Sequence, residues 1–181
     1  MAAAVVVVPL SADRAPALST FVSTLIDSLK YYTKRARREE IATYGPAQLA
    51  TMIKEDPASV LVAFAGLEIV GFCLSRYDDG LVWLAWFGVD ERYRRMGIGA
   101  QLLAALEQTA RLRNAHKVRC ETRTENVPSQ RLLSKFGFRQ IGHLKNHGYG
   151  QDFFLWEKYP GSERHIASLP QRRVVVEAST P

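Results

Sequence analysis

Cysteine is scarce in this sequence, and long apolar runs are missing. The two cysteines, Cys73 and Cys120, do not form a C-x-x-C pair. A disulfide framework is therefore excluded, and buried free thiols in a reducing compartment are the simpler interpretation. No apolar run approaches the roughly 20 residues of a membrane-spanning helix. The apolar start, Met1 to Val8, lacks a basic region and reaches Pro9 too soon for a signal peptide. These absences together predict a cytoplasmic protein.

Excess charge is also modest. Lys and Arg number 24 and Asp and Glu number 18, so the net charge is +6. This surplus favours an anionic ligand but does not establish a nucleic-acid binder. The 181 residues are 47% hydrophobic, which fits one globular domain, alone or with a tail, and argues against global disorder.

The apolar spacing predicts an alternation of strands and helices. Helices are expected where apolar residues recur every three to four positions, and strands where β-branched or continuous apolar runs end at turn residues. The segment Tyr31 to Glu40 is aromatic and then strongly charged, and is expected to lie on the surface between two helices. The order predicts an α/β (α+β) domain with a mixed sheet. The expected strands are Val5–Val8, Val60–Ala65, Ile69–Arg76, Leu81–Val89, Lys117–Thr122, Phe138–Leu144 and Asp152–Lys158.

The most informative segment joins the strand Leu81–Val89 to the longest predicted helix. It reads Val-Asp-Glu-Arg-Tyr-Arg-Arg-Met-Gly-Ile-Gly from Val89 to Gly99. A helix N-terminus offers unpaired N–H groups, glycines let a phosphate approach the backbone, and Arg92, Arg94 and Arg95 add positive charge. The segment matches neither the P-loop nor the Rossmann glycine pattern. It predicts a pyrophosphate site, although a G-x-G before a helix can also serve close helix packing.

Two blocks of this sequence resemble the signatures of the GNAT superfamily of N-acetyltransferases. The first is Arg94-x-x-Gly97-x-Gly99, and the second runs from Asn126 through Ser129 and Leu132-Leu133 to Gly137-Phe138. The resemblance implies a GNAT-like domain over residues 1–158, with a mixed, mostly antiparallel sheet of about seven strands and about four helices. Residues 159–181 are then a C-terminal extension, in which Arg173–Glu177 could add a strand to a partner subunit in a homodimer.

The resemblance also implies acetyl-CoA as co-substrate. In this family the fourth strand splays from the fifth, and the pantetheine arm enters the gap. The residues that would bind the co-substrate lie on that strand, on the following loop and around the second block. They are Phe87, Gly88, Val89, Arg94, Arg95, Met96, Gly97, Ile98, Gly99, Asn126, Arg131 and Lys135. For Arg131 and Lys135, a solvated helix face is an equally good explanation.

Catalytic candidates follow from the same resemblance, with two departures. The family's carboxylate on the fourth strand corresponds to Trp83, and its acid tyrosine corresponds to Leu133. Glu121, in Cys-Glu-Thr-Arg, is the candidate base, unless it is a surface glutamate paired with an arginine. Tyr149 is a weak candidate acid, and Tyr159 is another tyrosine near the closing strands. His143 and His147 lie four apart without a third ligand in sight, so a metal site is not expected.

The acceptor is expected to be a primary amine of a small molecule or a peptide N-terminus. Tyr31, Tyr32, Trp83 and Trp86 are candidate lining residues. The two tryptophans, three apart in a strand, are expected to face opposite sides. The basic and aromatic character of the expected pocket disfavours a polyamine. A catalytically silent acyl-CoA binding or sensing module is the alternative, because both usual catalytic positions are altered, and a nucleic-acid binder ranks last.

Overall fold

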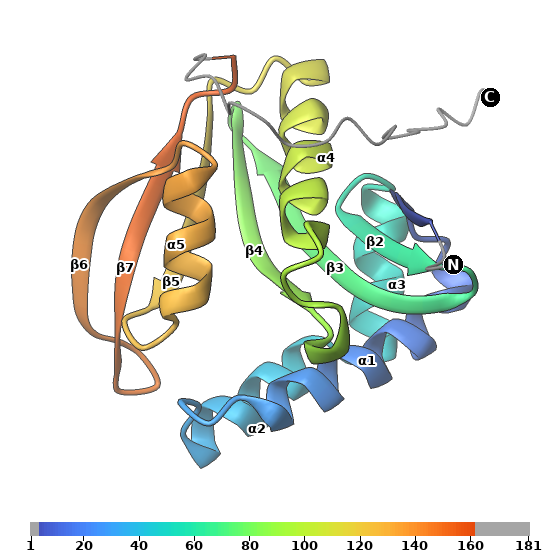
Figure 1. Ribbon diagram of the computed structural model, residues 1–181, viewed down its shortest axis with the longest axis horizontal. Helices are drawn as coiled ribbons and strands as arrows, with labels where there is room; N and C mark the ends of the chain where they lie inside the picture. The colour runs from blue at the N-terminus through green and yellow to red at the C-terminus, as the bar shows by residue number, and fades with distance from the viewer. Residues whose placement is uncertain (1–3, 162–181) are drawn as a thin grey trace.

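The computed structural model describes residues 4–161, which form one seven-stranded sheet covered by helices on both faces (Figure 1). The strand order is β1-β2-β3-β4-β5-β7-β6, and only the β4–β5 pair is parallel. This is the mixed, mostly antiparallel sheet that the sequence predicted. The strands are β1 (Val5–Pro9), β2 (Val60–Ala65), β3 (Glu68–Asp78), β4 (Leu81–Val89), β5 (Lys117–Arg123), β6 (Arg139–Gly148) and β7 (Gln151–Lys158).

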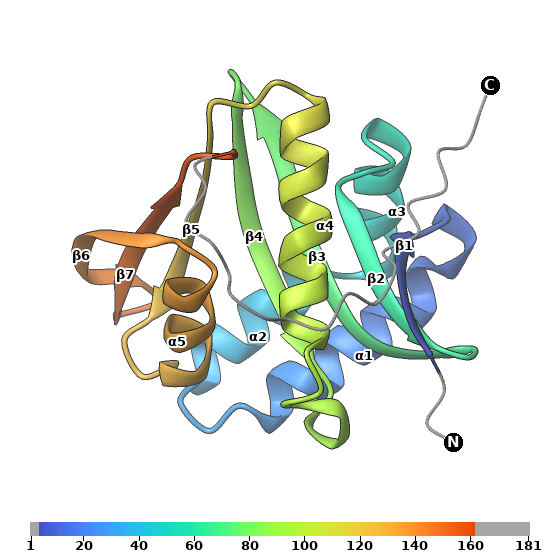
Figure 2. The ribbon, with the colours of Figure 1, turned by 45° about the horizontal axis from the view of Figure 1, so that its top comes forward.

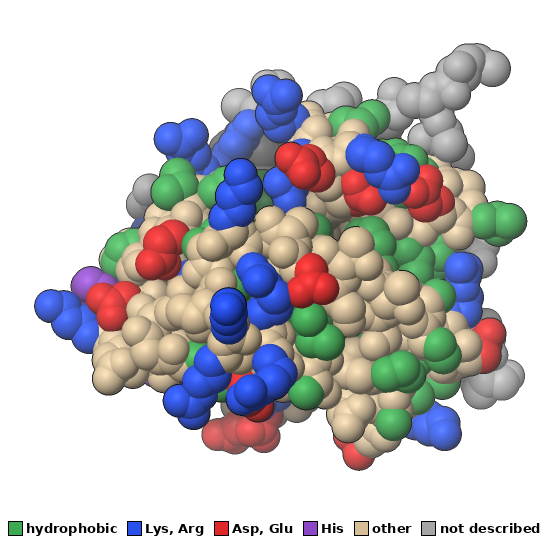
Figure 3. Space-filling view, turned by 90° about the horizontal axis from the view of Figure 1, so that it is seen from below, with side chains coloured by type: hydrophobic (Ala, Val, Ile, Leu, Met, Phe, Trp, Pro, Cys, Tyr) green, Lys and Arg blue, Asp and Glu red, His purple; other side chains and the backbone are tan. Residues whose placement is uncertain are grey.

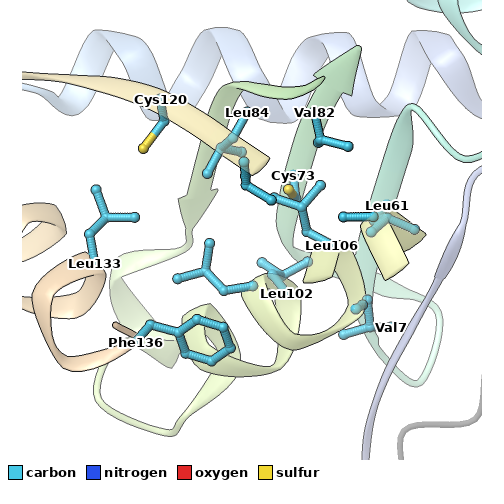
Figure 4. Packing of buried hydrophobic residues seen from close by; sticks show 14 of the residues in the cluster. Val7, Leu61, Cys73, Val82, Leu84, Leu102, Leu106, Cys120, Leu133 and Phe136 are labelled. Atoms are coloured by element: carbon cyan, nitrogen blue, oxygen red, sulfur yellow. The ribbon is translucent and has the colours of Figure 1, made fainter. Parts of the chain in front are cut away.

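One face of the sheet packs against α4 (Ile98–Leu112) and α5 (Val127–Lys135). The inward side chains of α4, among them Leu102 and Leu106, recur at helical spacing and are fully buried. Figure 4 shows them meeting Leu84 and Val82 from β4 and Leu133 and Phe136 from the α5 region. Cys73 and Cys120 are free thiols buried in this same cluster.

The opposite face packs against α1 (Ala15–Ser28), α2 (Lys34–Thr43) and α3 (Pro46–Glu55). Leu18, Val22 and Ile26 of α1 are fully buried there with Phe72 of β3. Figure 2 shows α4 and α1 crossing on opposite sides of the central strands. Strand β4 is therefore central and covered on both faces, as its continuous apolar sequence predicted.

Helix α2 is the main difference from the expected element order, because the charged segment after Tyr31 and Tyr32 is itself helical. Thr33 caps it, with its side-chain oxygen accepting a hydrogen bond from the Ala36 N–H at 3.1 Å. Ala36 is the only buried residue of α2. The helix therefore needs no apolar residues at helical spacing, and its sequence shows none that would predict it. The described chain thus has five α-helices rather than about four.

The predicted strand over Arg173–Glu177 lies outside the described residues, as does nearly all of the expected extension 159–181. Within the described part of the chain, no helix is long and apolar enough to cross a bilayer.

Candidate active site

Strands β4 and β5 separate partway along their length. They pair only from Leu81 with Lys117 to Leu84 with Cys120, after which β5 continues against β7 alone. On the β3 side of β4, Leu74 faces Trp86 and Ser75 faces Leu84, so Ala85 is an extra residue. Such a bulge bends a strand and ends pairing. Figure 1 shows the two strands diverging below their shared upper ends. The family's splayed strands are therefore present here.

A cavity of about 890 Å³ occupies this divergence and reaches across it to α1 and α2. Its walls include Phe87, Gly88 and Val89 from the open edge of β4, and Glu121 and Arg123 from β5. The same cavity therefore contacts both the predicted co-substrate residues and the predicted base.

The start of α4 forms one end of the cavity. Gly97 is the N-cap residue with a positive φ of 83°, a conformation that glycine adopts without steric cost, and no side chain caps this helix in the described structure. Gly97, Ile98 and Gly99 line the cavity with Arg94 and Arg95. Exposed N–H groups and two guanidinium groups at one helix end suit a pyrophosphate.

Gly97 and Gly99 are required in this loop for different reasons. A Cβ on Gly97 would meet nothing within 4 Å, so its requirement is the backbone conformation. A Cβ on Gly99 would lie 2.8 Å from Leu132 of α5. The Leu132 side chain therefore packs directly against Gly99, a local contact of the kind that the alternative interpretation of the G-x-G pattern requires.

Arg92 does not contribute positive charge to this end of the cavity. Its guanidinium lies 2.5 Å from Glu68 and 2.8 Å from Asp90, and Arg92 does not line the cavity. Hydrogen bonds from Tyr93 and Arg92 hold the pKa of Glu68 below its usual range. The sequence pattern placed three arginines at the predicted anion site, whereas in the structure Arg94 and Arg95 line the cavity and Arg92 does not.

The region of α5 supplies two further predicted residues. Asn126 caps the helix, with Oδ1 accepting from the Ser129 N–H at 3.3 Å, and it lines the cavity with Lys135. Arg131 and Met96 are exposed and lie outside the lining, so the structure does not bring them into the site. Leu133 is fully buried in the core, so no proton donor stands at the position that corresponds to the family tyrosine.

The far end of the cavity is aromatic. Tyr31, Tyr32 and Tyr44 line it with Trp83 and Trp86. The expectation that the two tryptophans face opposite sides is wrong. Their cross-strand partners are Arg76 and Leu74, two residues apart on β3 and so on one face. Because Ala85 is the extra residue of the bulge, the side chains of Trp83 and Trp86 lie on the same face although they are three positions apart.

This aromatic wall is internally connected. Trp86 stacks on Phe72, with ring centroids 5.1 Å apart, and its Nε1 donates to the Tyr32 hydroxyl at 3.1 Å. Burial raises the pKa of Tyr31 to about 12 and raises those of Tyr32 and Tyr44 further. All three phenols therefore stay neutral at physiological pH.

Arg123 is a cavity residue whose environment the sequence did not reveal. Its side chain is 5% exposed and donates from Nη2 to Glu40 at 3.1 Å and from Nε to Gln151 at 3.0 Å. The guanidinium also lies 3.7 Å from the centre of the Tyr32 ring. Because Glu40 and Arg123 lie 83 positions apart in the chain, no local pattern signals this pair.

Glu121 lines the cavity, but its partner is not an arginine. Its Oε2 lies 3.0 Å from Nε2 of His147 on β6, and both residues contact the cavity. His143 turns instead to Asp152, at 3.3 Å. Among the described residues, no three or more His, Cys, Asp or Glu side chains gather in a way that could hold a metal ion.

The two tyrosines considered as acids differ in position. Tyr149 lines the cavity, whereas Tyr159 does not. Tyr149 has a positive φ of 53°, and the Arg35 guanidinium of α2 lies 6.0 Å from the centre of its ring. Tyr149 is therefore the tyrosine of the two that the structure brings to the site.

The face that carries α1 and α2 also displays positive charge. Figure 3 views the molecule from that side and shows Lys and Arg side chains gathered near the centre of the face, with acidic side chains among them. The charge on this face is therefore mixed in sign and does not form a continuous basic surface.

Known proteins share both the sequence pattern and the fold. The family described as "Acetyltransferase (GNAT) family" matches residues 26–138. An N-alpha-acetyltransferase of Sulfurisphaera tokodaii is 32% identical over 117 residues, which cover 57% of this chain and 70% of that protein. A spermine/spermidine N(1)-acetyltransferase of Bacillus subtilis is 34% identical over 90 residues, covering 45% and 59% of the two chains.

A solved structure of another acetyltransferase has the same fold. The PaiA N-acetyltransferase of Thermoplasma acidophilum, in complex with coenzyme A, superposes with a TM-score of 0.73 at 18% identity. The match covers 86% of this chain and 99% of that one. That likeness shows the shared fold, and the family match over residues 26–138 together with the Sulfurisphaera tokodaii relative shows that this chain belongs to the GNAT acetyltransferase family.

Proposed function

We propose that this protein transfers an acetyl group from acetyl-CoA to a primary amine by direct attack in the β4–β5 cavity. The observation that carries the proposal is the continuity of that cavity. It joins the uncapped start of α4 to Glu121 and to an aromatic end. Two reactants held in one cavity gain most of their rate advantage from proximity and orientation.

The residues present fit acetyl-CoA. The β4 edge from Phe87 to Val89 has no β5 partner in the described structure, so its backbone groups can pair with the pantetheine amides. The N–H groups at Gly97 to Gly99, with Arg94 and Arg95, would hold the pyrophosphate. When bound, acetyl-CoA supplies the acetyl group as an activated thioester.

Glu121 is the proposed base. An amine attacks only when neutral, so a group at the site must take its proton. The hydrogen bond to His147 uses Oε2 of Glu121, which leaves Oε1 for the acceptor. Tyr149 is the proposed proton donor to the leaving thiolate, although a thiolate also leaves unaided at neutral pH.

The charges of the cavity favour an acceptor with one amine, on a small molecule or a peptide N-terminus. A polyamine needs unpaired carboxylates along its length. Here Glu40 is bound by Arg123, and Glu121 is bound by His147. The relatives include enzymes of both kinds by name, and the paired carboxylates support the peptide or small-amine class for this chain.

The test is thiol release from acetyl-CoA across a panel of tripeptides, small monoamines and spermidine. We expect turnover with a monoamine or peptide, and loss of about 100-fold in kcat for Glu121→Gln. Binding of CoA without turnover for any amine would instead support the silent acyl-CoA binding module. Preference for spermidine would contradict the argument from charge.

Two arginines provide a matched test of the pyrophosphate site. Arg94→Ala removes a cavity guanidinium and should raise the KM for acetyl-CoA by about 10-fold, the effect of one charge-assisted hydrogen bond. Arg92→Ala removes a guanidinium already held by Asp90 and Glu68 and should leave that KM within about twofold. Equal effects of the two substitutions would contradict this placement.

A further inference from the structure

Strand β6 departs from regular pairing just before its end. Leu144 faces Phe153 of β7, and the next pair is Gly148 with Gln151. Three residues of β6, Lys145 to His147, therefore oppose the single residue Asp152. The Asn146 N–H donates to Oδ1 of Asp152 at 2.8 Å, and Asn146 has a positive φ of 51°. These contacts hold the bulge in one shape.

The bulge matters because it brings His147 to a strand that is not its neighbour. Strand β7 lies between β6 and β5, and strands two apart in a sheet are roughly 10 Å apart. His147 nevertheless places Nε2 at 3.0 Å from Oε2 of Glu121. The imidazole crosses β7 against the Phe153 ring, with centroids 5.6 Å apart and an edge-to-face angle of 73°.

The two side chains also differ in exposure. The Glu121 side chain is 21% exposed and the His147 side chain is 45% exposed. The carboxylate therefore sits deeper in the cavity, and the imidazole lies on its solvent side. A carboxylate group rotates about its bond to the side chain, so it needs a fixed hydrogen-bond partner on one oxygen if the other oxygen is to face a reacting amine.

We infer that His147 is a positioning residue, whose Nε2–H holds Oε2 of Glu121 so that Oε1 faces the acceptor amine. The inference deepens the proposed function and rests on it, because it requires Glu121 to be the base. His147 itself transfers no proton in this scheme. The amine proton moves to Oε1 of Glu121, and the Nε2–H bond stays intact throughout.

A pair of substitutions separates hydrogen bonding from packing. His147→Gln keeps an N–H donor that can reach Oε2, whereas His147→Met fills similar space without a donor. We expect His147→Met to lower kcat about 10-fold and His147→Gln to stay within about threefold of the wild type. The KM for acetyl-CoA should not change in either variant. Gln140→Met removes an exposed amide from the same strand, outside the cavity, and as the control it should leave kcat unchanged.

A double variant tests whether the effect acts through Glu121. In a Glu121→Gln background, His147→Met should change kcat by less than about twofold, because the group that it positions is already gone. Equal kcat for His147→Met and His147→Gln, whether both high or both low, would overturn the positioning role. So would a full 10-fold further loss in the double variant.

These outcomes are distinct from a failure of the proposed function. If Glu121→Gln lowers kcat and His147→Met does not, the base assignment stands and the positioning role is refuted. If Glu121→Gln retains wild-type kcat, the base assignment itself fails and the inference fails with it. Retained CoA binding by each variant shows that it is folded when it is assayed.

Discussion

Removing the Arg123 guanidinium is expected to destabilise the protein by leaving the partly buried Glu40 carboxylate without its partner. Arg123 on β5 and Glu40 on α2 form an ion pair at 3.1 Å, with side chains 5% and 17% exposed. The same arginine binds Gln151, whose Nε2 in turn donates to the Tyr31 carbonyl at 2.7 Å. Arg123 therefore ties α2 and the segment before it to the second half of the sheet.

The expected magnitude follows from this burial. Breaking a buried pair by removing one partner costs about 3–5 kcal/mol, most of it from the remaining uncompensated charge. For Arg123→Met we expect about 3–5 kcal/mol. For Glu40→Met we expect about 3 kcal/mol, because the guanidinium keeps Gln151 and the Tyr32 ring at 3.7 Å. Since total stability is typically about 5–15 kcal/mol, both single variants should fold.

The double variant Glu40→Met/Arg123→Met tests whether the loss of stability comes from the charge that each single variant leaves unpaired. It leaves no unpaired charge, so its loss should be at least about 3 kcal/mol smaller than the sum of the two single losses. Urea unfolding of all four proteins, followed by circular dichroism, measures this coupling. If the losses add within about 0.5 kcal/mol, the pair does not join the two halves of the cavity and the reasoning is refuted.

Two further predictions concern the strands around the site. Gly88→Ala would press a Cβ against Leu25 and should cost about 1–3 kcal/mol in urea unfolding. The control Gly142→Ala, whose Cβ would meet its nearest atom at 3.5 Å, should be neutral or stabilising by up to about 1 kcal/mol, and equal losses would contradict the packing argument. Burial raises the pKa of Glu157, but hydrogen bonds led by that from Lys117 outweigh it and lower the pKa to about 2. Its contribution to the free energy of unfolding should be complete above about pH 4.3 and fall as the pH drops toward 2. In urea unfolding, the wild type should therefore lose its extra stability over Glu157→Gln across that window. A difference that stays constant with pH would contradict the lowered pKa of Glu157.

Several features of the site follow from local sequence alone. Gly97 adopts a positive φ at the start of α4, and Asn126 caps α5, because both depend on residues within one helical turn. The strands around β4 follow from apolar runs bounded by turn residues. Each of these features depends on neighbouring residues in the chain, so it can be predicted without knowing which other elements pack against it.

The residues that form the cavity wall were harder to predict from the sequence. Trp83 and Trp86 share a face only because Ala85 is a bulge, and the bulge is set by pairing with β3. Helix α2 buries one residue, Ala36, so its charged sequence carried no periodic signal. Arg131 and Met96 lie beside the motif residues in the sequence, yet both are exposed and neither lines the cavity.

The sequence by itself indicated the family, the order of the strands and of every helix except α2, and the loop suited to a pyrophosphate, because each depends on residues adjacent in the chain. Only the tertiary structure decided the partners of the reacting groups. Glu121 meets His147 across an intervening strand, and Arg123 meets Glu40 from 83 positions away. Such pairs form when sheet register and helix docking bring distant side chains within about 3 Å of each other, and no spacing in the sequence encodes that distance.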